Sequence, residues 1–419
     1  MSLSPLNSAP KAGQSHPLLP TYRQTFFPPK AIDTLELQAT SFPKSFIDVK
    51  NRLVQCLKNL WSSIVNCFSS KTKLHSITFG PFTIIPSQYP HHISNANKQF
   101  VYNYLVRGRN IDDPVTVTKW GLKDPRPMNK LPLFATTKPQ IVPVDGPFRY
   151  EASTADTVHW TANFADRNLF GFCEGPLLAQ DELQVLEHPA LAHVKNALPA
   201  EQRILEPLDT VLFQNVPRLG ALDALTPIPA HDTQILYANY FATPAQAEIL
   251  SRLTRSLYGN YFTNATQREI LTRLTPFSYR TSSNIFAIVA PHISSALEGQ
   301  PYQKKDLGRL FFTFYNASQS IKVTCPGKKI VLHTGNWGCG AFGNDPKTVY
   351  ILQMAAARFA GIDELQIHPL SHQNEFQAAR QLLDQIEQRF PQMTVDQFID
   401  HLQTHAAEYG LTYKRGNGT

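Results

Sequence analysis

The sequence predicts an α/β fold, because segments typical of buried strands alternate with segments typical of amphipathic helices. Residues 329–332 are a short apolar run typical of a buried strand, and a glycine-rich loop and an apolar-periodic helix that opens at Pro346 follow it. Further on, residues 364–368 predict a strand, and residues 374–390 and 395–409 predict two helices. This alternation is typical of an α/β sandwich, and a chain of 419 residues can bury a large core.

Composition excludes some functions and leaves others open. The net charge of +7 and pI of about 9.0 suit nucleic acid, an acidic protein or a phosphate ligand, although the basic residues are scattered. Five dispersed cysteines are too few for a disulfide framework or a zinc cluster, which favours a reducing compartment. No run approaches the roughly 20 apolar residues of a membrane span. We expect a cytoplasmic monomer, and neither a Ser-His-Asp order nor an HExxH pattern supports a protease.

The N-terminal part differs in character from the rest. Residues 1–40 are rich in Pro, Ser and Thr and lack an apolar signal segment, so they predict a disordered arm. Residues 45–68 predict an amphipathic helix; its basic polar side would suit a membrane surface, but we expect it to pack against the neighbouring domain. We assign residues 41–150 to a helical and irregular accessory region without chemical residues. An arm of this kind would also suit an effector delivered into another cell.

The loop after the strand at 329–332 contains four glycines within nine residues, namely Gly335, Gly338, Gly340 and Gly343. A strand, a glycine loop and a helix N-terminus together bind phosphate, because glycines let backbone N–H groups turn toward an anion that the helix dipole favours. The spacing fits neither the dinucleotide-binding nor the P-loop pattern. A tight turn is the alternative, although it has no need of the large aromatics Trp337 and Phe342. His333, beside the loop, is expected to be a packing residue at the strand end.

A second segment, residues 163–191, follows a predicted strand at 157–164. It contains Gln180, Asp181 and Glu182 at the start of a predicted helix. Acidic residues there can simply complement the helix dipole. The functional alternative is one carboxyl group beside a dry pocket, which gives a proton and takes one back.

Together the two segments resemble the poly(ADP-ribose) glycohydrolase family, whose catalytic domain is an elaborated macrodomain. Phe164-Ala165-Asp166, Phe170-Gly171-Phe172 and Gln180-Asp181-Glu182 occur in the order of the family's Phe-Ala-Asn strand end, triple-glycine loop and Gln-Glu-Glu triplet. Residues 334–343, then Asp345 and an Ala-rich helix, resemble its second hallmark, and residues 283–290 resemble a strand between the two. The resemblance implies a macrodomain-like three-layer α/β/α sandwich over residues 151–419.

The resemblance also implies roles for individual residues. Glu182 would be the catalytic carboxyl group, Asp181 would orient the ribose hydroxyls, and Gln180 would anchor the triplet. It implies no metal and no cofactor, and its partners would be ADP-ribose or poly(ADP-ribose) and ADP-ribosylated protein. The substrate-binding residues that it implies are Asn163, Asp166, Gly171, Phe172, Gln180, Gly335, Asn336, Trp337, Gly338, Cys339, Gly340, Ala341, Phe342 and Gly343.

The chain departs from the family pattern at several positions. Phe170 and Phe172 replace glycines, so either residue would be strained, or the loop reshaped, if its position needs a positive φ. Asp181 replaces a Glu of the family's triplet. Asp166 stands where the family has Asn, and Asn163 stands where it has Asp, so the negative charge changes place between these two positions. The main hypothesis is an ADP-ribose glycohydrolase. The alternatives are an ADP-ribose-binding module without turnover and, more weakly supported, a phosphate-ligand protein with an unrelated acidic partner.

A repeat lies outside the resemblance. Residues 240–254 recur at 261–275 with an offset of 21, which predicts a duplicated helical insertion at about 239–280. Two copies are too few for a solenoid. The insertion is either a surface decoration or a contact with the modified protein.

Overall fold

The computed structural model describes residues 75–88, 93–109, 111–175, 178–222, 274–340 and 342–416. The predicted arm, the amphipathic helix at 45–68, Ala341 and most of the repeated segment lie outside these residues. Among the helices in the described ranges, none is both long enough and apolar enough to span a membrane.

One mixed sheet of eight strands organises the described residues, in the order β1-β2-β5-β6-β4-β7-β8-β3. The run from β6 to β3 is parallel throughout, whereas β1, β2 and β5 pair in antiparallel fashion. The carboxyl ends of the five parallel strands therefore meet at one edge, where α/β sheets bind ligands. The strands are β1 His75–Ile84, β2 Val115–Leu122, β3 Gln140–Pro143, β4 Thr157–Phe164, β5 Asp209–Leu222, β6 Leu274–Ile288, β7 Lys329–Gly335 and β8 Glu364–His368.

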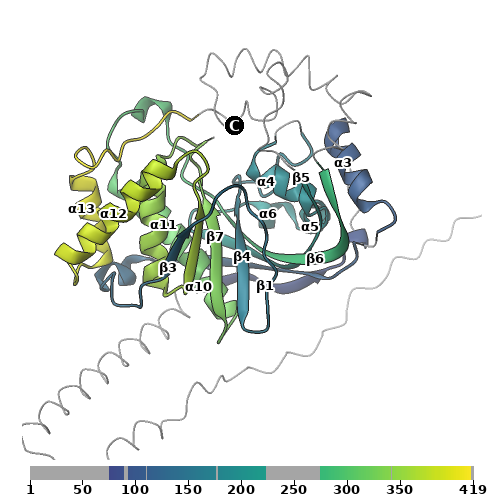
Figure 1. The fold of residues 1–419 in the computed structure, drawn as a ribbon, viewed down its shortest axis with the longest axis horizontal. Coiled ribbons are helices and arrows are strands. Elements are labelled where there is room, and N and C mark those ends of the chain that lie inside the picture. Colours follow the sequence, from purple (N-terminus) through teal and green to yellow (C-terminus); the bar gives the residue numbers. More distant parts are fainter. Residues whose placement is uncertain are drawn as a thin grey trace, which may run out of the picture. The chain divides into compact units, whose positions relative to one another are not determined.

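Helices cover both faces of the sheet (Figure 1), with α10 and α11 on one face and α4 and α5 on the other. Alternate strand residues separate the two cores: Leu212 and Phe286 join the core of α10 and α11, whereas Phe213 and Ile285 join that of α5. The predicted three-layer α/β/α sandwich is thus confirmed. The helices are α3 Ala96–Val106, α4 Gln180–Glu187, α5 Ala190–Ala197, α6 Ala200–Arg203, α10 Lys304–Thr324, α11 Pro346–Ala360, α12 Gln373–Arg389 and α13 Val395–Thr404, with 3₁₀ turns at Pro86–Gln88, Arg126–Lys130 and Ser295–Leu297.

Several predicted elements around the loops are confirmed. Strands β4 and β8 have the expected bounds, and α11 begins at Pro346 with Asp345 as its N-cap, whose side chain accepts a hydrogen bond from the Thr348 N–H. The last helix was predicted to run to residue 409, but α13 ends at Thr404.

Two stretches differ from the sequence analysis. The region assigned to an accessory layer contributes β1, β2 and β3 to the main sheet, within one compact unit that begins at Ser70. Strand β2 is buried along almost its whole length, although Val115 to Thr118 alternate apolar and polar side chains. Residues 274–280, predicted as the end of a helical insertion, belong to β6, whose Leu274 pairs with Leu222 of β5. The helical prediction is wrong there because strand pairing overrides local periodicity.

Candidate active site

Two loops leave the same edge of the sheet side by side. Strands β4 and β7 are neighbours and parallel, with Thr157 opposite Lys329 and Thr161 opposite His333. The chain that follows Phe164 and the glycine loop that follows Gly335 therefore start next to each other at the carboxyl edge. This strand order brings together two segments that are about 170 residues apart in the sequence.

Glutamine side chains fasten α4 to the end of β4. The Phe164 N–H donates to Gln180 Oε1 at 2.9 Å, and Gln180 Nε2 donates to the Ala162 carbonyl at 3.2 Å. One turn later, Gln184 Oε1 accepts from Asn163 Nδ2 at 2.8 Å. Four residues apart on a helix share one face, so these two glutamines fix the rotation of α4 about its axis. The intervening residues, Asp181 and Glu182, are held in place by the same contacts.

Asp181 and Glu182 form a buried acidic pair, with exposed fractions of 6% and 2%. Glu182 Oε2 accepts a hydrogen bond of 2.8 Å from the Ala179 N–H, while its buried Oε1 has no hydrogen-bond partner among the described residues. Burial, and then the charge of the neighbouring Glu182, raise the pKa of Asp181 well above its usual value. Asp181 therefore tends to keep its proton, and an unsatisfied buried oxygen on Glu182 marks a place where function can be expected.

Lys98, from α3, is a buried cation beside this pair that the sequence analysis missed. Its ammonium group donates to the carbonyls of Phe172 and Cys173 at 3.4 and 3.3 Å. Burial lowers the pKa of Lys98, and the charges of Glu182, Cys173 and Asp181 oppose that shift. No local pattern distinguishes a single lysine on a helix, so the sequence offered no signal for this residue.

The loop after β4 contains the two phenylalanines in different environments. Phe170 has a left-handed φ of +57° and is 1% exposed, with its ring centroid 5.5 Å from that of Phe213. Phe172 is 51% exposed. A Cβ on Gly171 between them would lie 2.8 Å from the Asn168 carbonyl oxygen, so a side chain there has no room. Phe170 thus takes a strained backbone conformation while its ring anchors the loop in the core.

At the end of β7 and in the loop that follows it, space requires glycine at three positions. A Cβ on Gly335 would lie 2.7 Å from the His368 carbonyl oxygen. At Gly338, with φ of +70°, it would lie 2.4 Å from the Ala290 Cβ, and at Gly343, with φ of +71°, 2.6 Å from the Lys414 carbonyl oxygen. These glycines permit close backbone packing as well as the left-handed turns.

The larger side chains of the glycine loop hold its shape. The Trp337 ring lies in the core at 1% exposure, and its Nε1 donates to the Ile288 carbonyl at 3.3 Å. Asn336 accepts from the Tyr350 hydroxyl and donates to the Pro369 carbonyl at 3.3 Å. Phe342 is half-buried, with its ring centroid 5.7 Å from that of His292. Cys339 and Gly340 are also half-buried.

The remaining predicted site residues are divided between surface and core. Asn163 has no exposed surface, and its Oδ1 lacks a partner among the described residues. Asp166 is half-buried and accepts from the Asn168 N–H at 2.8 Å. In the described ranges, Asp181 and Glu182 belong to no group of three His, Cys, Asp or Glu residues that could hold a metal ion.

Residues 248–376 match the family model described as poly(ADP-ribose) glycohydrolase (PARG), macro domain fold. This match confirms the resemblance inferred from the sequence. It includes β7, the glycine loop and α11, and it does not include α4.

Similar solved structures include PARG from Deinococcus radiodurans in complex with ADP-ribose, at 13% identity and a TM-score of 0.32, covering 74% of this chain and 94% of that chain. A second crystal form of that complex has 14% identity, a TM-score of 0.34 and coverages of 73% and 95%. The apo form has 13% identity, a TM-score of 0.29 and coverages of 73% and 93%. Comparison with curated proteins gave no match.

Proposed function

We propose that this chain, a divergent relative of the poly(ADP-ribose) glycohydrolase family, is a glycoside hydrolase that removes ADP-ribose from polymer or modified protein. The observation that carries the proposal is that α4, which holds the buried acidic pair, is bonded to the end of β4, and that the glycine loop follows the neighbouring parallel strand β7. The family match to the glycine-loop half supports it. The acidic half rests on the sequence order and on the geometry of α4.

In the proposed reaction, Glu182 is both general acid and general base. It protonates the oxygen that leaves C1″ of the ribose, and the C1″–O bond breaks to give an oxocarbenium-like centre. Water then adds to C1″ and returns its proton to Glu182. The Ala179 N–H fixes one oxygen of the carboxyl group, which leaves Oε1 as the oxygen for proton transfer.

Asp181 and Lys98 have supporting roles in this proposal. The raised pKa of Asp181 favours a neutral carboxyl group that can donate a hydrogen bond to a ribose hydroxyl. Lys98 offsets negative charge at the pair and holds the carbonyls of Phe172 and Cys173, so it positions the loop after β4.

The glycine loop would bind the diphosphate through its backbone. Asp345 already occupies the N-cap of α11, where its carboxylate accepts from the Thr348 N–H at 2.9 Å. An anion at that helix terminus would meet this negative charge. The loop that contains Gly338 and Gly343 is therefore the better source of N–H donors for phosphate.

The test is the release of free ADP-ribose from poly- and mono-ADP-ribosylated protein. We expect Glu182→Gln to lower the rate by about 100-fold or more, because a positioned acid and base contributes at least that much. Calorimetry should show that the variant still binds ADP-ribose. Glu201→Gln, the same substitution at an exposed residue of α6, is the matched control and should match the wild type. Equal rates for Glu182→Gln and wild type would contradict the assignment of Glu182 as general acid and base.

An ADP-ribose-binding module without turnover is the second candidate. The side chain of Phe172 stands where the family has a glycine, and Glu182 is 2% exposed, both of which favour a site closed to the reaction. No release by the wild type from either substrate, together with ADP-ribose binding, would establish this candidate. A higher rate on one substrate would assign the enzyme to polymer or to single ADP-ribose groups.

A further inference from the structure

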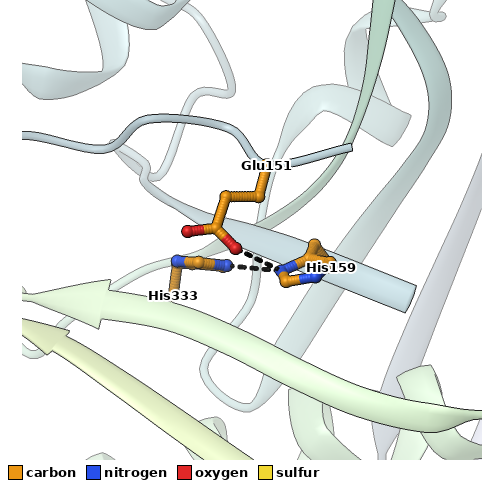
Figure 2. Close-up of side chains that lie close together, drawn as sticks. All are labelled: Glu151, His159 and His333. Carbon is orange, nitrogen blue, oxygen red and sulfur yellow. Dashed lines mark hydrogen bonds and ion pairs between the residues drawn. The ribbon is translucent and has the colours of Figure 1, made fainter. Parts of the chain in front are cut away.

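Three side chains with metal-binding atoms, none of them a member of the acidic pair, converge beside β4 and β7. Glu151 precedes β4, His159 lies within it, and His333 lies within β7; Figure 2 shows them pointing toward one another. His159 Nδ1 is 3.0 Å from His333 Nε2 and 3.5 Å from Glu151 Oε2. The three donor atoms all lie within 4.8 Å of one another.

The cluster is on the sheet face opposite α10 and α11. Trp160 and Leu332, the strand neighbours of the two histidines, belong to the core beneath those helices. Because successive strand residues point to opposite faces, His159 and His333 point to the other face. Glu151 reaches them from the connection between β3 and β4.

The distances fit a tetrahedral metal ion. Zn²⁺ binds nitrogen and oxygen ligands at about 2.0–2.2 Å, so two ligand atoms of a tetrahedron lie roughly 3.3–3.6 Å apart. The two separations from His159 Nδ1, 3.0 and 3.5 Å, are within a small adjustment of that value. Two imidazoles and one carboxylate are also a donor set that zinc uses when its fourth position stays open to water.

Hydrogen bonds among the three groups satisfy fewer of their lone pairs than a bound metal ion would. His159 Nδ1 faces both His333 and Glu151. If it carries a proton, that single N–H is divided between two acceptors. If it does not, its lone pair faces a carboxylate. A divalent cation would satisfy a lone pair on each of the three groups.

We propose that Glu151, His159 and His333 bind one Zn²⁺ ion. His333 is buried, whereas the Glu151 side chain is 48% exposed, so the cluster is open to solvent on the Glu151 side. The proposal is independent of the proposed hydrolase function, because none of the three residues belongs to the acidic pair or the glycine loop.

The ion would fasten the connection between β3 and β4 to the sheet. In the same connection, the Phe148 ring contacts those of Phe164 and His368, at centroid distances of 6.0 and 4.8 Å. Phe164 ends β4 and bonds to Gln180 of α4. A metal at Glu151 would therefore brace the strand end to which α4 is attached, and its first measurable effect is on stability.

The experiment is a calorimetric titration of chelator-treated, full-length protein with Zn²⁺, followed by metal quantification after dialysis. We expect one Zn²⁺ per chain and a higher Tm with the metal. Glu151→Gln and His159→Ala should each weaken binding at least about tenfold and remove the Tm increase. His405→Ala is the matched control, since His405 is a half-buried histidine paired with Glu408 at 2.9 Å, and it should bind Zn²⁺ like the wild type.

The proposal fails if the wild type retains well under one Zn²⁺ per chain, or if Glu151→Gln and His159→Ala bind it as tightly as the wild type does. His159 is only partly exposed, so His159→Ala could disturb folding. Glu151→Gln keeps the test decisive, because it changes an exposed side chain; circular dichroism would verify its fold.

Discussion

The loops that follow β4 and β7 both need left-handed backbone, and they obtain it in different ways. In the loop after β7, Gly338 and Gly343 take it where an added Cβ would come within 3 Å of other atoms. In the loop after β4, Phe170 takes it with a full side chain, which is buried against Phe213. A left-handed residue therefore need not be glycine when its ring has space in the core. The burial of a phenylalanine, worth about 2–3 kcal/mol, can exceed a backbone strain of about 1 kcal/mol.

The same two regions differ in charge. Around α4 lie the buried ionisable residues Asp181, Glu182 and Glu187, together with His188. The glycine loop is held in place by the Trp337 ring and the Asn336 amide. We therefore expect the stability of the α4 region to respond to pH. The stability of the glycine loop should respond to substitutions that change side-chain volume.

Replacement of Phe170 should have the largest effect on stability. Phe170→Ala removes the buried ring, which costs about 4 kcal/mol, and keeps a Cβ at a positive φ. Phe170→Gly removes the same ring but relieves the backbone, so it should cost about 3 kcal/mol. The measurement is the free energy of unfolding in urea. Equal stability of the two variants would mean that the left-handed conformation of Phe170 stores no strain.

Gly338→Ala should have the next largest effect, a loss of about 3 kcal/mol in the free energy of unfolding. Its Cβ would meet Ala290 Cβ at 2.4 Å and Asn344 Nδ2 at 2.7 Å, in addition to the cost of the positive φ. Gly410→Ala is the control, because Gly410 has φ of +67° and no atom within 4 Å of the added Cβ. Gly410→Ala therefore measures the cost of the positive φ alone, about 1 kcal/mol in the free energy of unfolding. If the two variants lose the same stability, close packing does not explain Gly338.

Acid should remove the contribution of His188 to the stability of the α4 region. Its ring is fully buried, with Nε2 2.9 Å from the Ser283 hydroxyl, and burial lowers its pKa to about 3 from an ordinary 6.5. The unfolded chain takes up this proton below pH 6.5 and the folded chain does not, so stability falls as pH drops from 6.5 toward 3. At about 1.4 kcal/mol per unit, the loss between pH 7.5 and pH 5 is about 2 kcal/mol.

His188→Gln isolates that contribution from those of other histidines. Glutamine can replace hydrogen bonds of the ring but does not titrate. Urea unfolding at pH 7.5 and pH 5 should show a decline about 2 kcal/mol smaller in the variant than in the wild type. An identical decline in both proteins would show that His188 does not govern acid sensitivity.

Local patterns in the sequence were enough to predict the elements around both loops. The strand at β4, the N-cap at Asp345 and the first helical residue Pro346 depend on neighbours a few residues away. The glycine spacing likewise identified the loop after β7. Aromatic residues were more ambiguous, because Trp337 is as suitable for the core as for a ligand, and the structure places its ring in the core.

Contacts across the sheet could not be predicted in this way. Lys98 approaches Glu182 only because α3 packs near the loop after β4, and His159 meets His333 only because β4 and β7 are neighbours. Strand order is a property of the whole fold, so no short window contains it.

The smallest expected effect on stability is at Phe172, and this residue distinguishes the two functional hypotheses. Because the ring is 51% exposed, Phe172→Gly should change the free energy of unfolding by less than about 0.5 kcal/mol. If the ring contacts the ligand, as the family resemblance implies, the Kd for ADP-ribose measured by calorimetry should rise about fivefold, equivalent to about 1 kcal/mol. A lower Kd, accompanied by release of ADP-ribose that the wild type lacks, would instead show that Phe172 blocks a site that the family's glycine leaves open. That outcome would make the wild-type chain a binding module.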